Sequence, residues 1–71
     1  MAVQVIQEIA DARELTATSR TLLEQADEVA RQAKSLPGPQ RVELEAAARN
    51  LVAEAKRLAR LADRVVKRAA S

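Results

Sequence analysis

The chain contains no cysteine, no histidine and no aromatic residue, and it has only one glycine and two prolines among its 71 residues. Without cysteine there is no disulfide and no thiolate ligand, and without histidine the commonest metal ligand is missing. A single glycine excludes a glycine-rich phosphate loop. With no Phe, Trp or Tyr, a core must come from Leu, Val, Ile and Ala, and no ring is available to stack on nucleic-acid bases.

Long apolar runs are also missing. No segment approaches the ~20 apolar residues of a membrane-spanning helix, and residues 1–10 lack the basic start and apolar stretch of a signal peptide. We therefore expect a soluble protein, cytoplasmic if it is expressed without a signal. Because the hydroxyl groups have no histidine or apolar-face lysine to activate them, we also expect no enzymatic activity, no cofactor and no metal.

What the chain does contain is a regular spacing of apolar residues three and four positions apart in both halves. This spacing is typical of a helix that packs against another helix. We name two rows by their commonest residue. The alanine row is Ala12, Ser19, Ala26, Ala33, Ala48, Ala55, Ala62 and Ala69. The leucine row is Leu15, Leu22, Val29, Leu36, Leu44, Leu51, Leu58 and Val65.

The one Pro/Gly cluster, residues 37–39, separates the two halves. When the chain is folded back there, members of the same row meet in pairs whose numbers sum to 80 or 81, such as Ala26 with Ala55 and Leu22 with Leu58. The predicted fold class is therefore all-α, an antiparallel helical hairpin. We expect helices over about residues 2–35 and 40–69, and a turn over 36–39 in which Gly38 permits the reversal.

The two helices are predicted to pack closely but to bury little apolar area between them. Alanine alternating with larger residues lets two helices approach toward the short end of the ~8–10 Å packing range. The residues assigned to this seam are Leu15, Ser19, Leu22, Ala26, Val29, Leu44, Leu51, Ala55, Leu58 and Val65. So small a chain with so light a core is hard to stabilise alone.

A third row lies beside the alanine row, and most of it is apolar. This flanking row is Ile9, Thr16, Leu23, Ala30, Glu45, Val52, Ala59 and Val66. The other side of the hairpin is mostly polar, so one side has not finished burying its core. A second hairpin placed there gives a four-helix bundle or a larger helical oligomer. The predicted oligomer interface is Val5, Ile6, Ile9, Thr16, Leu23, Ala30, Val52, Ala59 and Val66.

Three alternatives remain open for this side and its neighbourhood. The hairpin is a loosely folded monomer that exposes the apolar side, or it is an adaptor that receives a helix of a different protein. The third rests on Arg57, Arg60, Arg64 and Lys67, which follow helical spacing and could contact phosphates or anionic lipid. We favour a solvated face there, because Asp63 interrupts the run and cations suit a helix C-terminus.

Two hydroxyl residues, Thr16 and Ser19, fall inside the proposed core. A buried hydroxyl without a partner costs ~1–3 kcal/mol, so each needs a hydrogen bond. One possibility is a contact that fixes the register or the choice of partner. The other, which we favour, is a bond to the carbonyl four residues back in the same helix.

The charges are ordered as well. Residues 1–36 carry four Lys/Arg and six Asp/Glu, whereas residues 37–71 carry eight and four. Within each predicted helix acidic residues come early and basic residues late, as the helix dipole favours. Charges of opposite net sign on the two helices also favour their pairing, although exposed pairs contribute only tenths of a kcal/mol.

Regular Ala/Leu spacing, mirrored halves, ordered charges and a Pro-Gly-Pro turn together resemble a de novo designed helical hairpin. The architecture is also similar to that of small natural proteins that dimerise hairpins into antiparallel four-helix bundles, such as the plasmid RNA-binding repressor-of-primer family. This resemblance is one of pattern and carries over no functional residue. It implies a structural module that assembles with itself, first as a homodimer. The residues themselves, and not the resemblance, lead us to expect no binding of nucleic acid, membrane or metal.

Overall fold

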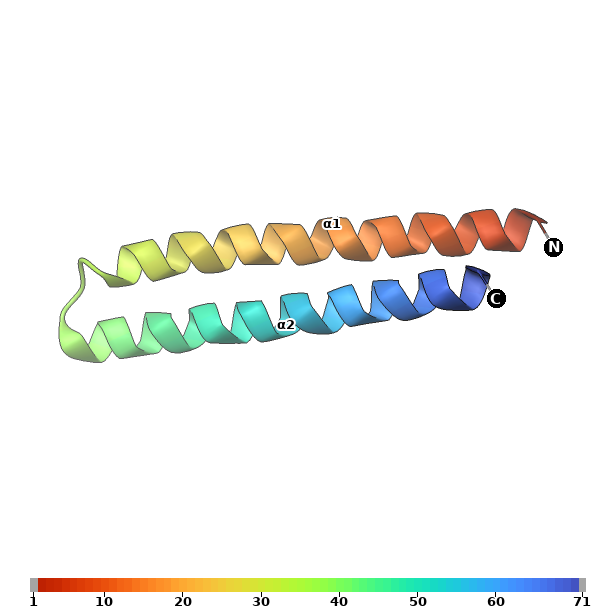
Figure 1. The fold of residues 1–71 in the computed structure, drawn as a ribbon. Helices are drawn as coiled ribbons and strands as arrows, with labels where there is room; N and C mark the ends of the chain where they lie inside the picture. Colours follow the sequence, from red (N-terminus) through yellow and green to blue (C-terminus); the bar gives the residue numbers. More distant parts are fainter. Residues whose placement is uncertain (1, 71) are drawn as a thin grey trace.

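The chain folds into two long helices that run antiparallel and lie side by side along their length (Figure 1). This computed structural model describes residues 2–70, with side chains from residue 4 onward. Helix α1 spans Ala2–Ala33 and helix α2 spans Gly38–Ala70. No strand occurs within residues 2–70. The predicted all-α helical hairpin is confirmed.

The turn lies about two residues earlier than predicted, because α1 ends at Ala33 and not at residue 35. The last turn of α1 tightens into successive i→i+3 hydrogen bonds, which satisfy carbonyls that an α-helix would leave open. These bonds run from Lys34 N to Arg31 O (3.3 Å), from Ser35 N to Gln32 O (3.3 Å) and from Leu36 N to Ala33 O (3.1 Å).

Helix α2 begins at Gly38 rather than at residue 40. The Pro37 carbonyl accepts a hydrogen bond from Arg41 N at 2.8 Å, so Gly38 and Pro39 both lie in the first helical turn. The missing N–H of Pro39 leaves no bond unmade there. No described glycine has a positive φ. The prediction that Gly38 makes the reversal is therefore wrong, and residues 34–37 make it, since Pro37 disfavours helical geometry at Leu36.

The side chain of Arg41 fastens the two helices together at the turn. Its Nε donates to the Ala33 carbonyl at 3.3 Å and its Nη2 donates to the Lys34 carbonyl at 2.7 Å. Both acceptors lie at the C-terminal end of α1, where carbonyls lack helical partners and a positive charge is favourable. Arg41 thus caps α1 from the first turn of α2.

The alanine row forms the buried centre of the hairpin. Every member of the row is buried except Ala69, which is half-buried, and Ala55 has 0% exposed surface. Every member of the leucine row is only half-buried. No large side chain among the described residues is fully buried. The hairpin therefore encloses alanines and one serine, and its larger apolar side chains keep part of their surface in water.

Of the two hydroxyl residues assigned to the core, Ser19 is buried, whereas Thr16 is exposed in the hairpin. They form different kinds of hydrogen bond. Thr16 Oγ1 donates to the Ala12 carbonyl in its own helix at 2.9 Å, as predicted. Ser19 Oγ instead donates across the hairpin to the Ala55 carbonyl at 2.7 Å, and this bond is buried. The own-helix prediction is therefore wrong for Ser19. A side chain as short as serine reaches the opposite backbone because small residues at this level let the helices approach closely.

Candidate protein interface

A shallow groove runs along the side of the hairpin that carries the flanking row. It consists of two adjoining hollows of about 890 and 320 Å³, both of which include Arg20 in their walls. Alanines of the buried row form the floor of the groove, with Ala26 and Ala48 in the larger hollow and Ala12 in the smaller. Flanking-row side chains stand beside this floor, and they are Leu23, Ala30 and Val52 in the larger hollow and Ile9, Thr16 and Val66 in the smaller.

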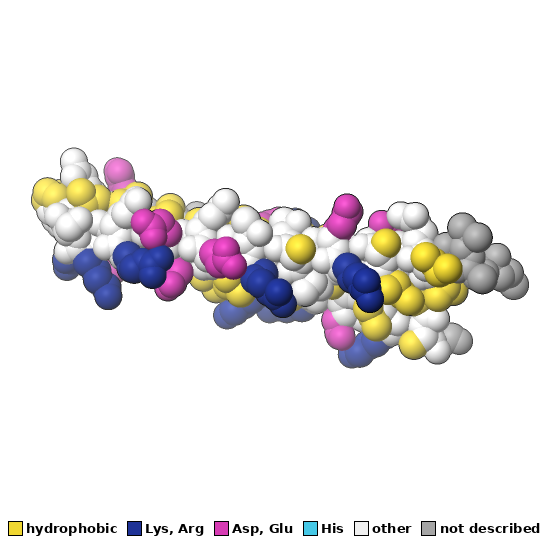
Figure 2. Space-filling view, turned by 90° about the horizontal axis from the view of Figure 1, so that it is seen from above, with side chains coloured by type: hydrophobic (Ala, Val, Ile, Leu, Met, Phe, Trp, Pro, Cys, Tyr) yellow, Lys and Arg dark blue, Asp and Glu magenta, His cyan; other side chains and the backbone are white. Residues whose placement is uncertain are grey.

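Several apolar side chains in and near the groove are exposed. Leu23 is 45% exposed, Ile9 is 41% exposed and Val66 is 47% exposed. Val5 and Ile6 extend this exposure along α1 toward the end opposite the turn, which we call the open end. In Figure 2, hydrophobic side chains gather near that end of the molecule. Apolar surface in water is unfavourable, and the groove side leaves such surface exposed.

Cations line both walls of the groove. Arg13 and Arg20 rise from α1, and Arg49, Lys56 and Arg60 rise from α2, whereas Glu24 and Asp27 are the lining carboxylates. Lys and Arg side chains project at intervals along one edge of the molecule in Figure 2. Within the described chain none of the five lining cations forms an ion pair. The groove is thus apolar along its floor and positive along its walls.

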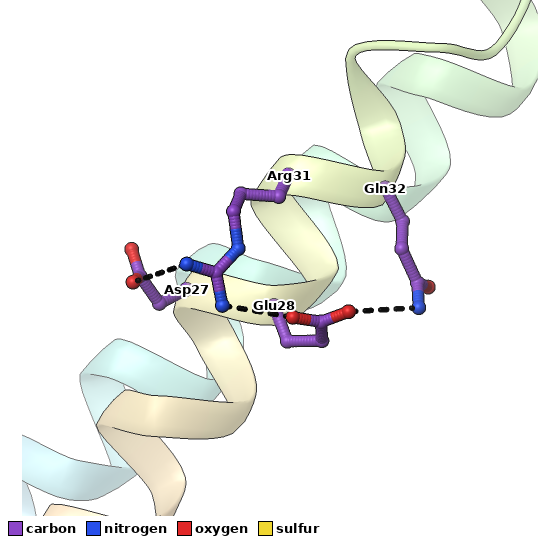
Figure 3. A network of polar contacts seen from close by, with 4 residues as sticks. All are labelled: Asp27, Glu28, Arg31 and Gln32. Carbon is purple, nitrogen blue, oxygen red and sulfur yellow. Dashed lines mark hydrogen bonds and ion pairs between the residues drawn. The ribbon is translucent and has the colours of Figure 1, made fainter.

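One of the two lining carboxylates is already paired with a cation. Arg31 Nη1 lies 3.5 Å from Asp27 Oδ2, and Arg31 Nη2 lies 2.8 Å from Glu28 Oε2 (Figure 3). Gln32 donates to the other oxygen of Glu28 at 3.4 Å. The hydrogen bond to Glu28, with the charges of Glu28 and Asp27, raises the pKa of Arg31. Asp27 therefore offsets little of the positive charge along the groove.

The basic face of α2 is partly neutralised by its own helix. Arg57 hydrogen-bonds to both carboxylate oxygens of Glu54, with Nε 3.1 Å from Oε2. That hydrogen bonding lowers the pKa of Glu54 below its ordinary value. Lys67 Nζ lies 3.0 Å from Asp63 Oδ2. Two of the four cations proposed as an anion-binding face are therefore engaged in ion pairs, which weakens the case for that face.

Other kinds of site find no support in the described residues. None of their His, Cys, Asp and Glu side chains gather in a group of three or more that could hold a metal ion. Neither helix, over its described length, has the run of apolar residues that crossing a bilayer needs.

The structure places the predicted interface residues unevenly around this groove. Six of them line it, namely Ile9, Thr16, Leu23, Ala30, Val52 and Val66. The remaining three, Val5, Ile6 and Ala59, are exposed but line neither hollow. The predicted seam residues are all buried or half-buried. Sequence reasoning named Arg60 only as part of the basic face of α2. It missed the other four lining cations, although Arg13, Arg20, Arg49 and Lys56 each follow the alanine row by one position.

Comparison with protein-family models, with curated proteins and with solved structures found no match to this chain.

Proposed function

We propose that this protein is a structural module without catalytic activity that assembles with itself through the groove. The observation that carries the proposal is the composition of the core, because the hairpin fully buries no large apolar side chain among those described. Burial of apolar area is the main favourable term in folding, at about 25 cal/mol per Å². A second copy placed over the groove would cover Ile9, Leu23, Val52 and Val66 and complete the core.

The proposed assembly is a homodimer that forms a four-helix bundle. Two hairpins that place their grooves together form an isologous contact, in which the same surface of each copy faces the other. The alanine floor lets the second pair of helices approach closely, and the half-buried leucine row supplies further apolar surface. The mirrored Ala/Leu rows and the ordered charges also support a designed origin. Discovery of a natural protein with the same rows in both helices would contradict that origin.

Sedimentation equilibrium over a wide range of protein concentrations tests this assembly. We expect a mass of two or more chains for the wild type, and a helical monomer for the variant Leu23→Glu with Val52→Glu. Each new carboxylate would replace an apolar side chain that the dimer buries, and removing it from water there costs several kcal/mol, of which the nearby lining cations return only part.

The matched control is Thr18→Glu with Ala47→Glu. It adds the same charge at exposed positions that line neither hollow, so its mass should equal that of the wild type. A wild type that remains monomeric at every concentration would refute self-assembly. A groove variant that keeps the wild-type mass would refute the interface.

A further inference from the structure

We propose that the groove also binds an amphipathic helix of another protein whose apolar stripe is flanked by acidic residues, and that this helix displaces the second copy of the chain. The proposal goes beyond self-assembly but uses the same groove, so the two occupants exclude each other. Three features support this partner: the shape of the groove, the charge of its walls, and the poor match that a second copy makes to that charge.

The shape suits a single helix. Between Ile9 and Ala30 the groove follows α1 for about 30 Å at ~1.5 Å per residue, which is the length of a helix of about 20 residues. A helix in an apolar groove places residues at i, i+3, i+4 and i+7 on the floor. Alanines at the floor leave room for leucine-sized side chains of the incoming helix, and Leu23 and Val52 flank them on either side.

The positive charge of the walls favours a helix that has acidic residues on either side of its apolar stripe. Five cations line the groove against two carboxylates, of which Asp27 is paired with Arg31. Acidic side chains beside the apolar stripe of a bound helix would lie next to these cations. Long Lys and Arg side chains can cover apolar surface with their stems while their charged ends reach such carboxylates. Complementary potentials of this kind raise specificity and the association rate.

The cations are also staggered along the groove, apart from Arg20 and Arg60, which rise from opposite helices near its middle. Arg49 and Lys56 lie on α2, toward the turn, whereas Arg13 lies on α1, toward the open end. Near the turn the α1 wall instead carries the carboxylates Glu24 and Asp27. A bound helix therefore needs acidic residues facing α2 in one half and facing α1 in the other. This stagger distinguishes the two directions in which a helix could lie in the groove.

A second copy of the chain fits this charge less well. In a groove-to-groove dimer each copy brings the same excess of cations to the interface, and like charges near each other are unfavourable. An acid-flanked helix removes that repulsion and still covers the apolar floor. For this reason the heterotypic complex should replace the homodimer when both are possible.

Two synthetic peptides of about 20 residues, the length of the groove, test the proposal. Both carry the same leucine stripe, and one has glutamate and the other lysine at the flanking positions. Because its own charges repel, each peptide is discouraged from self-association. We expect the glutamate peptide to bind one chain, with an affinity on the order of tenfold or more above that of the lysine peptide, and we expect added salt to reduce this preference.

A charge reversal supplies the decisive comparison. The variant Arg20→Glu with Lys56→Glu leaves three cations along the groove and, besides the paired Asp27, three carboxylates, so the preference for the glutamate peptide should be lost. The control Arg57→Glu with Arg64→Glu makes the same change at exposed cations of α2 that line neither hollow, so it should retain the glutamate preference. Fluorescence anisotropy of labelled peptide measures the affinities, and sedimentation measures the mass of each complex.

The outcomes separate this proposal from self-assembly. Equal affinity for the two peptides, or an unchanged preference after charge reversal, would overturn the acid-flanked partner. Binding to anionic vesicles without binding to either peptide would also overturn it. If the chain alone is monomeric and still binds the glutamate peptide in the groove, the partner helix is upheld and self-assembly is refuted. If the chain self-associates and binds neither peptide, self-assembly is upheld and the partner helix is refuted.

Discussion

Replacement of Ala55 by leucine tests whether the alanine row sets how closely the helices pack. Ala55 has 0% exposed surface, and its counterpart on α1, Ala26, is also buried. At 2.7 Å from Ser19 Oγ, the Ala55 carbonyl is within direct reach of α1. A leucine at this position finds no free space, so the helices must move apart or the side chain must adopt a strained rotamer.

The expected destabilisation follows from these contacts. Overpacking a well-packed site costs typically ~1–3 kcal/mol. Separation of the helices at this level would also lengthen the Ser19 hydrogen bond, and such a bond contributes about 1 kcal/mol. We therefore expect Ala55→Leu to lower the free energy of unfolding by about 2–4 kcal/mol. For a small domain this is a large fraction of the total stability.

Urea denaturation followed by circular dichroism measures the change. All variants are compared at one protein concentration, because self-association adds to the apparent stability. The control Ala47→Leu makes the same substitution at an exposed position of α2. Alanine and leucine have similar helix propensity, so the control should change stability by less than ~0.5 kcal/mol. If the free energy of unfolding falls equally little in both variants, the alanine row does not limit the approach of the helices.

Two further substitutions test the polar contacts between the helices. Ser19→Ala removes the bond to the Ala55 carbonyl, and we expect a loss of less than about 1 kcal/mol because alanine favours the helix. Thr21→Ala, which removes an own-helix bond at an exposed site, should instead raise stability, and an equal gain for Ser19→Ala would refute the role of the cross-helix bond. Arg41→Gln shortens the side chain that caps α1 and should cost about 1 kcal/mol, whereas Arg64→Gln should cost little. Unchanged hydrogen exchange at residues 34–37 in the Arg41 variant would contradict that cap.

The burial pattern was predictable because it depends on one property of the helix. With a repeat of 3.6 residues, positions three and four apart share a side, so the alanine and leucine rows identify the contact surface without any knowledge of the turn. The same repeat placed Leu23 and Val52 on one side of both helices, where the groove now lies. Row spacing did not show that the alanine row is central and the leucine row only half-buried.

The details that sequence reasoning missed depend on three-dimensional proximity. The end of α1 is set by i→i+3 bonds near residue 34 and by a side chain from the next helix, Arg41, which no pattern within α1 reveals. Ser19 had a local carbonyl available in principle, and the choice of the Ala55 carbonyl follows from how close the second helix comes. Finding the groove cations would have required comparing, on both helices together, the positions that follow the alanine row.

The alanine row links the close packing of this hairpin to its need for a partner. Small side chains let α1 approach α2 until Ser19 reaches the opposite backbone, which fixes one helix against the other along their length. The same small side chains supply little apolar area, and the larger ones beside them remain half-exposed or exposed. Larger side chains in the alanine row would bury more apolar area but would prevent the close approach of the two helices. This is why we propose that further apolar burial comes from a chain that covers the groove, whether a second copy or an acid-flanked helix.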